Sequence, residues 1–120
     1  MTREDLLNRC SNFGVNCIFL TRKIPRNFEN SIIFNQIIRS SCSVGANYSE
    51  AVESESKKDF IHKILICKKE IKETIHWLFI LEKINMNLNN SLNFDNCLQE
   101  ANELLKIFSK TVYTSRNNIN

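Results

Sequence analysis

The segment SKKDFIHKILICKKEIKETIHWLFILEKIN, residues 56–85, predicts the longest helix of the chain. Its apolar side chains recur at alternating spacings of four and three residues, a pattern typical of a helix that packs along one seam. Ser56 stands where an N-cap is expected, and an acid follows in the first turn. Such a helix is about 45 Å long and needs partners along its whole length. The seam consists of Phe60, Ile64, Cys67, Ile71, Thr74, Leu78 and Leu81.

Three further stretches carry the same spacing. We expect helices over about 4–23, 30–53, 56–85 and 94–113, with Asn27 or Asn30 as the N-cap of the second and a loop over Asn85 to Ser91. The added seams are Leu6, Cys10, Phe13, Cys17, Leu20 and Ile24, then Ile33, Ile37, Ser40, Val44, Asn47 and Ala51, then Phe94, Cys97, Ala101, Leu104, Phe108 and Thr111. Gly14, inside the first helix, suggests close approach of another helix.

Composition supports an all-α fold. The 120 residues include two Gly and one Pro, too few for the turns of a barrel, a sandwich or a βα repeat. We therefore expect a single domain over residues 1–120, an up-down-up-down antiparallel four-helix bundle, with a polar and frayed tail over 114–120. The apolar surplus beyond one core predicts contacts between subunits.

The same composition bounds location and redox state. No apolar run is long enough to span a bilayer, and the N-terminus lacks a signal segment, so we expect a soluble, cytoplasmic protein with no membrane contact. The five cysteines are odd in number and form no CxxC pair. We interpret them as small buried thiols in a reducing compartment, in preference to disulfides or a zinc site.

No motif for catalysis is present. The sequence has no HExxH, no glycine-rich phosphate loop and no GxSxG. Its histidines, His62 and His76, are about 21 Å apart along one helix and cannot share a metal within a subunit. Glu70 and Glu73 lie among lysines, which favours a solvated ion-pair face over an acid and base pair. We expect no enzyme, no catalytic residue, no metal and no cofactor.

Two runs are more specific than the periodicity. The first is QIIRSSCSVGANYSEA, residues 36–51, and the second is SKKDFIHK, residues 56–63, followed at fixed spacing by Glu70, Glu73-Thr74 and Trp77-Leu78. Together they resemble the second and third helices of the small bundle proteins encoded by intervening sequences within bacterial 23S rRNA genes. The resemblance covers about Leu6 to Phe108.

The resemblance implies a homopentameric ring without established catalytic activity and with a suspected nucleic-acid role. A distant branch of similar bundles serves retroelements as an accessory protein that engages a reverse transcriptase and its template RNA. The residues that we assign to a structural or interface motif are Gln36, Arg39, Ser43, Asn47, Glu50, Asp59, Phe60, Glu70, Thr74 and Trp77.

The polar residues of this motif lie at or near inward positions of a packed helix, where they must be paired. One interpretation is a hydrogen-bonded network between the second and third helices, such as Asn47 to Thr74 or Glu50 to Lys63, that fixes register or a subunit contact. The other interpretation is a recognition site. Trp77 is expected at a helix interface.

Basic side chains are the remaining functional signal. A ring of five subunits would multiply the net charge of +3 to about +15, enough for salt-sensitive phosphate binding. We expect a non-enzymatic protein that binds structured RNA; the alternative is a protein-interaction adaptor, such as an accessory subunit for a reverse transcriptase. The candidate nucleic-acid-binding residues are Lys57, Lys58, Lys63, Lys68, Lys69, Lys72, Arg22 and Lys23, and antiparallel packing would allow parts of the two groups to merge.

Overall fold

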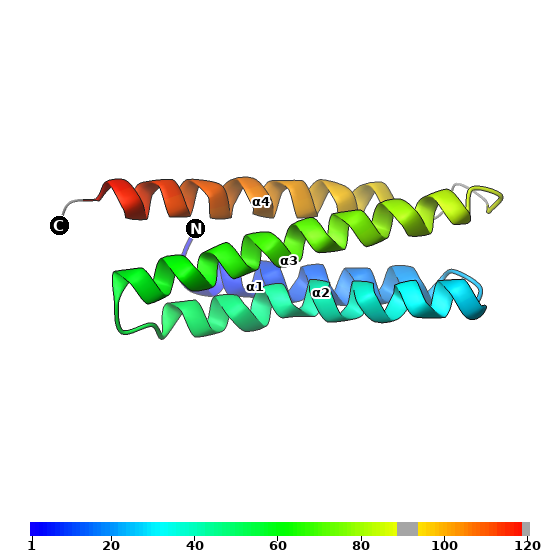
Figure 1. The fold of residues 1–120 in the computed structure, drawn as a ribbon, viewed down its shortest axis with the longest axis horizontal. Helices are drawn as coiled ribbons and strands as arrows, with labels where there is room; N and C mark the ends of the chain where they lie inside the picture. Colours follow the sequence, from blue (N-terminus) through cyan, green and yellow to red (C-terminus); the bar gives the residue numbers. More distant parts are fainter. Residues whose placement is uncertain (89–93, 119–120) are drawn as a thin grey trace.

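The computed structural model describes residues 1–88 and 94–118, which form four long helices. These are α1 (Arg3–Arg22), α2 (Phe28–Val52), α3 (Lys57–Ile84) and α4 (Phe94–Asn117). Successive helices run in opposite directions along a bundle of 53 × 21 × 21 Å (Figure 1). The predicted all-α four-helix architecture is confirmed, and the bounds of the first three helices differ from the predicted ones by at most two residues.

Three helices begin at side-chain caps. The Thr2 hydroxyl accepts from the Asp5 backbone N–H at 3.0 Å while the Asp5 carboxylate accepts from the Thr2 N–H, forming a capping box. The Asn27 side chain accepts from the Asn30 backbone N–H and caps α2, and the Ser56 side chain accepts from the Asp59 N–H and caps α3. Asn27, and not Asn30, is therefore the N-cap of the second helix.

The C-terminal tail differs from the prediction. Residues 114–117, expected to be frayed, continue α4 to Asn117. The Asn117 amide donates to the Tyr113 carbonyl at 2.8 Å, and the Lys57 ammonium donates to the Asn118 carbonyl. These contacts extend the helix beyond the last buried residue, Val112, where apolar periodicity gives no further signal.

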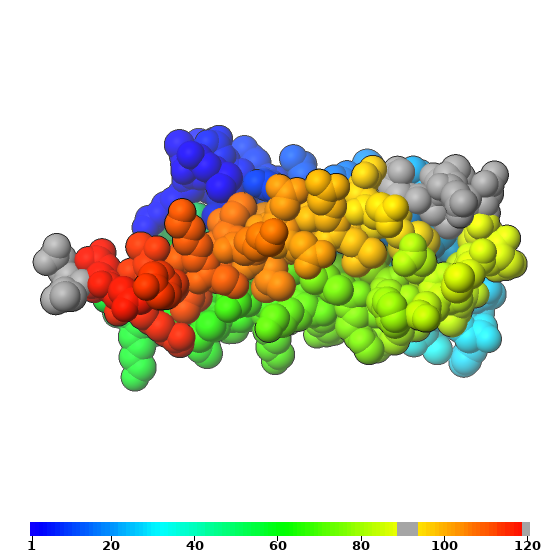
Figure 2. Space-filling view, turned by 90° about the horizontal axis from the view of Figure 1, so that it is seen from above, coloured from blue at the N-terminus to red at the C-terminus, as the bar shows by residue number. Residues whose placement is uncertain are grey.

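Each helix contacts two others, so the bundle is closed in the order α1, α2, α3, α4. The contact between α1 and α4 is the smallest of the four, and the backbones of α1 and α3 do not come close to each other. Viewed from the side of α4, that helix lies between α1 and α3, which flank it on opposite sides (Figure 2). Surfaces of α1 and α3 are thus diagonal across the bundle.

The core follows the predicted seams closely. All six seam residues of α1 are buried, as are those of α3 except for Phe60, which is half-buried. Two further seam residues, Asn47 and Thr111, are half-buried too, and Tyr48 and Val112 lie inside in their place. The Tyr48 ring packs on Phe108 with centroids 5.7 Å apart, so an aromatic contact takes the interior position.

Two glycines allow α1 and α2 to approach closely. A Cβ on Gly14 would lie 3.2 Å from the Cys42 Sγ and 3.3 Å from the Cys42 Cα, tighter than ordinary packing. Gly45 faces the Cys10–Ser11 backbone in return, at ordinary van der Waals distance. The predicted close approach at Gly14 is confirmed, and its neighbour is α2.

A buried amide pair joins the start of α2 to the end of α3. The Asn30 and Asn85 side chains exchange hydrogen bonds of 3.0 and 2.9 Å, and each is at most 9% exposed. Asn85 also caps α3 and donates to the Leu81 carbonyl. Asn85 therefore belongs to the core edge and not to an open loop; residues 89–91 of the predicted loop lie outside the described residues.

Candidate functional site

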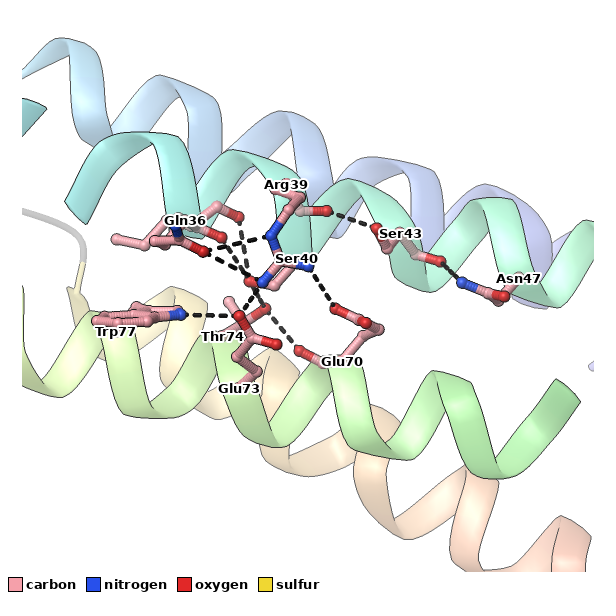
Figure 3. A network of polar contacts seen from close by, with 10 residues as sticks. Gln36, Arg39, Ser40, Ser43, Asn47, Glu70, Glu73, Thr74 and Trp77 are labelled. Atoms are coloured by element: carbon pink, nitrogen blue, oxygen red, sulfur yellow. Dashed lines mark hydrogen bonds and ion pairs between the residues drawn. The ribbon is translucent and has the colours of Figure 1, made fainter. Parts of the chain in front are cut away.

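The motif residues of α2 and α3 form a polar network along the outer edge of their contact (Figure 3). Arg39 reaches from α2 to the carboxylates of Glu70, at 3.4 Å, and of Glu73. The Trp77 indole N–H donates to the same Glu73 carboxylate at 3.0 Å, within α3, and the half-buried ring packs against the core. Gln36 accepts from the Arg39 guanidinium on its other side.

Buried hydroxyls extend this network inward. The Ser40 and Thr74 hydroxyls are hydrogen-bonded at 2.7 Å, and Thr74 also donates to the Glu70 carbonyl. The predicted hydrogen bond from Asn47 to Thr74 is wrong. The Asn47 amide donates instead to the Ser43 carbonyl in its own helix, at 2.8 Å. Ser40, two turns earlier, is the actual partner of Thr74; its place on the seam gave the signal.

The second predicted link is present. The Lys63 ammonium donates to the Glu50 carboxylate at 2.7 Å, between α3 and α2. With Arg39 bound to two carboxylates and the hydroxyls paired, the charged groups of the network compensate one another. Such an arrangement specifies the alignment of two helices. The geometry supports the interpretation of a structural network between α2 and α3.

The predicted basic residues do not form one surface. Arg22 and Lys23 end α1, whereas Lys57 and Lys58 begin α3 at the opposite end of the bundle, since α1 and α3 run in the same direction (Figure 1). Because α1 and α3 are diagonal neighbours, their basic residues stay apart along the sides as well. Lys63 is neutralised by Glu50.

Four lysines nevertheless share the outward face of α3, and we call them the α3 ridge: Lys58, Lys69, Lys72 and Lys83. Successive lysines are 11, 3 and 11 residues apart. Eleven residues are close to three whole turns of an α-helix, and residues three apart are neighbours on its surface. All four are exposed, and no carboxylate within residues 1–88 and 94–118 pairs with them. The ridge is about 37 Å long.

Histidine and aromatic side chains complete the ridge. His62 and His76 are exposed beside the lysines, and the Lys83 ammonium lies 5.0 Å from the centroid of the exposed Phe79 ring. Sequence reasoning missed Lys83 because it stopped at the lysine-rich first half of the helix. The helical period from Lys69 could have found it.

The cysteines are all free, and four of the five are buried as predicted. Burial raises the pKa of Cys10 and of Cys67 to about 12, so both stay protonated and unreactive at neutral pH. Cys42 is exposed. Among the described residues, no three side chains of the types that bind metals come together, and no helix has the length and apolarity needed to cross a bilayer.

Comparison with known proteins agrees with the fold. Residues 4–110 match the model of the family described as 23S rRNA-intervening sequence protein. A crystal structure of a protein of unknown function from the S23 ribosomal protein family of Bacteroides thetaiotaomicron is similar, with a TM-score of 0.81 and 27% identity over 95% of this chain and 100% of that chain. None of the curated proteins matches. The match spans most of the sequence, including both motif runs, and the chain therefore belongs to the 23S rRNA-intervening sequence protein family.

Proposed function

We propose that this protein is a non-enzymatic, cytoplasmic scaffold that binds structured RNA through the α3 ridge. The observation that carries the proposal is a row of four exposed lysines without ion-pair partners on one helix face. Glu70 and Glu73 of α3 are bound by Arg39. A phosphate can therefore bind the four ridge ammonium groups without displacing a paired carboxylate.

The exposed ring of Phe79 adds a second kind of contact. An aromatic side chain beside a basic row provides a stacking surface for an unpaired base, whereas regular duplex RNA offers mainly phosphates and 2′-hydroxyls. Phe79 is 53% exposed and held next to Lys83. The proposed ligand is therefore an RNA helix with a loop or bulge.

Self-association is part of this proposal. Large apolar side chains remain exposed on α1, α2 and α3 near the end of the bundle where α1 leads into α2: Phe19, Phe28, Ile32 and Ile84. Such exposure favours burial against another subunit. A homopentamer, the assembly that the resemblance implies, would place five α3 ridges on one particle. Size-exclusion chromatography with light scattering tests this, and a monomer at micromolar concentration would contradict it.

The RNA experiment compares two triple variants of equal charge change. The first replaces Lys58, Lys69 and Lys72 by Glu, and the matched control replaces the exposed Lys106, Lys110 and Arg116 of α4 by Glu. Binding to a structured ribosomal RNA fragment, and to a scrambled RNA of the same length, is measured across a salt series. We expect the α3 variant to lose at least tenfold in affinity and its salt slope to fall by about 2.

The control variant should retain most of its affinity. Equal losses in both variants would mean that only net charge matters, and the α3 ridge would then be the wrong surface. Absence of binding to either RNA at low salt would contradict the RNA proposal. It would favour the second candidate, a protein-interaction adaptor such as an accessory subunit for a reverse transcriptase, which the exposed apolar side chains support.

A further inference from the structure

An open pocket of about 420 Å³ lies where α1 leads into α2, and it shares no residue with the polar network or the α3 ridge (Figure 1). Two arginines line it, Arg22 at the end of α1 and Arg26 in the connection to α2. We call it the arginine pocket; its other lining residues are Thr21, Ile24, Ser31, Phe34, Asn35 and Ile38. Among the described residues, the lining therefore contains two positive charges and no acidic side chain.

The charges of these two arginines are not compensated by carboxylates. Arg22 and Arg26 are exposed, and no ion pair within residues 1–88 and 94–118 involves either of them. The Arg22 guanidinium lies 5.5 Å from the centroid of the Phe19 ring, a cation–π contact that uses none of its hydrogen-bond donors. Arg9 and Arg39, by contrast, are each bound to two carboxylates. The arginine pocket therefore offers guanidinium N–H groups to an anionic ligand.

The backbone that carries Arg26 is held on both sides. The Asn30 amide donates to the Pro25 carbonyl at 3.0 Å, and the same amide is paired with Asn85 at the edge of the core. On the other side of Arg26, the Asn27 side chain accepts from the Asn30 backbone N–H at 2.8 Å as the N-cap of α2. The connection is therefore in position before a ligand arrives, which lowers the entropic cost of binding.

The rest of the lining provides an apolar wall and hydrogen-bonding groups. Ile24 and Phe34 are 4% and 8% exposed, and Ile38 is half-buried, so these side chains are fixed by packing. Ser31 and Asn35 add a hydroxyl and an amide, which can each donate and accept hydrogen bonds. The volume lies in the range of about 300–1,000 Å³ that is typical of small-molecule sites. A ligand that fits this lining has an anionic group, a polar middle and an apolar part.

We propose that the arginine pocket binds a nucleoside 5′-monophosphate, either free or as the phosphorylated 5′-terminal nucleotide of an RNA strand. The two guanidiniums hold the phosphate, because their N–H groups match its oxygens and a dianion balances both positive charges. A carboxylate would balance only one of them. The base packs on the apolar wall, and Ser31 and Asn35 supply hydrogen bonds to the ribose hydroxyls or the base edge. This site is independent of the α3 ridge.

The test is isothermal titration calorimetry of the full-length protein with AMP, with adenosine and with inorganic phosphate. We expect AMP to bind at least about tenfold more tightly than either of the other two, because only AMP engages both the arginines and the apolar wall. Equal affinities for AMP and inorganic phosphate would contradict the assignment of a nucleotide. No detectable binding of AMP at about 1 mM would overturn the proposal altogether.

Two variants locate the ligand, and circular dichroism verifies that each is folded. The first replaces Arg22 and Arg26 by Gln and should lower the affinity for AMP at least about tenfold. Its control replaces the exposed Lys110 and Arg116 of α4 by Gln and should retain the affinity. The second variant, Asn35→Trp, fills the pocket without removing charge and should also abolish binding. Unchanged affinity in the arginine variant, or an equal loss in its control, would show that the ligand binds elsewhere.

Two short single-stranded RNAs of one sequence, with and without a 5′-phosphate, distinguish the two sources of the ligand. Tighter binding of the phosphorylated RNA, with competition by AMP, identifies the 5′-terminal nucleotide. Equal binding of both RNAs, with AMP binding intact, identifies the free nucleotide. The variant of Lys58, Lys69 and Lys72 should bind AMP as tightly as the unaltered protein, so a failure of the α3 ridge and a failure of the arginine pocket give different results.

Discussion

Polar side chains are paired along the contact between α2 and α3, whereas a cavity of about 330 Å³ lies between α1 and α4, whose contact is the smallest in the bundle. The first contact holds a buried Asn30–Asn85 pair, a Ser40–Thr74 pair and several ion pairs. The second has Arg9 with two glutamates and small buried cysteines. We infer that the α2–α3 contact fixes one alignment of its two helices, whereas the α1–α4 contact allows small shifts between its helices.

We expect the greatest loss of stability from a core substitution in α3. Ile71 is fully buried, and Ile71→Ala should lower the free energy of unfolding by about 3–4 kcal/mol through lost burial and a new cavity. Cys97→Ala, at the existing cavity, should cost about 1 kcal/mol or less. Urea denaturation measures both. Similar losses for the two variants would contradict the conclusion that α4 packs less tightly on α1 than α3 packs in the core.

The buried amide pair should show strong coupling. Asn30→Ala or Asn85→Ala alone leaves the other amide short of a partner, which should cost about 2 kcal/mol. The double variant should cost at least about 1 kcal/mol less than the sum of the single ones, because no amide of the pair is then left behind. Additive losses in the double-mutant cycle would show that the pair contributes no specific alignment.

Arg9 and Arg39 each form ion pairs across one of the two contacts, so replacing them measures what those ion pairs contribute. Arg9 binds the Glu100 carboxylate with two hydrogen bonds of 2.7 Å, and this raises the pKa of its guanidinium. Arg9→Leu should cost about 1 kcal/mol in low salt and less in high salt, since the pair is partly exposed. Arg39→Leu should cost a similar amount, because its side chain is 48% exposed. Denaturation at two salt concentrations checks both values.

The smallest effect is a gain in stability. Asn16 is exposed and lines the cavity, so Asn16→Leu should add about 0.5–1 kcal/mol by filling space between α1 and α4 and by raising helix propensity. Asn12→Leu, on the same helix but away from the cavity, reports the propensity part alone. If the two variants gain equally by thermal melting, the cavity is not a packing defect.

Apolar period and capping residues predicted the helices, their direction and nearly all of the core. The failures have a common cause. Asn47 was expected inside because seven-residue spacing from Ser40 reaches it, yet Tyr48 has a ring that packs on Phe108. The apolar period of one helix carries no information about the shape of the helix that packs on it. Which of two adjacent residues is buried therefore depends on the assembled bundle.

The candidate site was predictable in part. The lysines of α3 and the Glu50–Lys63 pair follow from helical spacing and charge. The separation of these lysines from Arg22 and Lys23 could not be predicted in this way, because it depends on which helices lie diagonally across the bundle. The Arg9–Glu100 ion pair joins residues from the first and last helices, and a single sequence holds no signal for such pairing.

The order in which the helices touch also bears on how the chain folds. Three of the four contacts join consecutive helices, and these need only short loops to close. The α1–α4 contact alone brings together the two ends of the sequence. A bundle with this topology is expected to fold rapidly through its hairpins and to dock α4 on α1 last. In native-state hydrogen exchange, amides of α4 should accordingly open more often than those of α2 and α3.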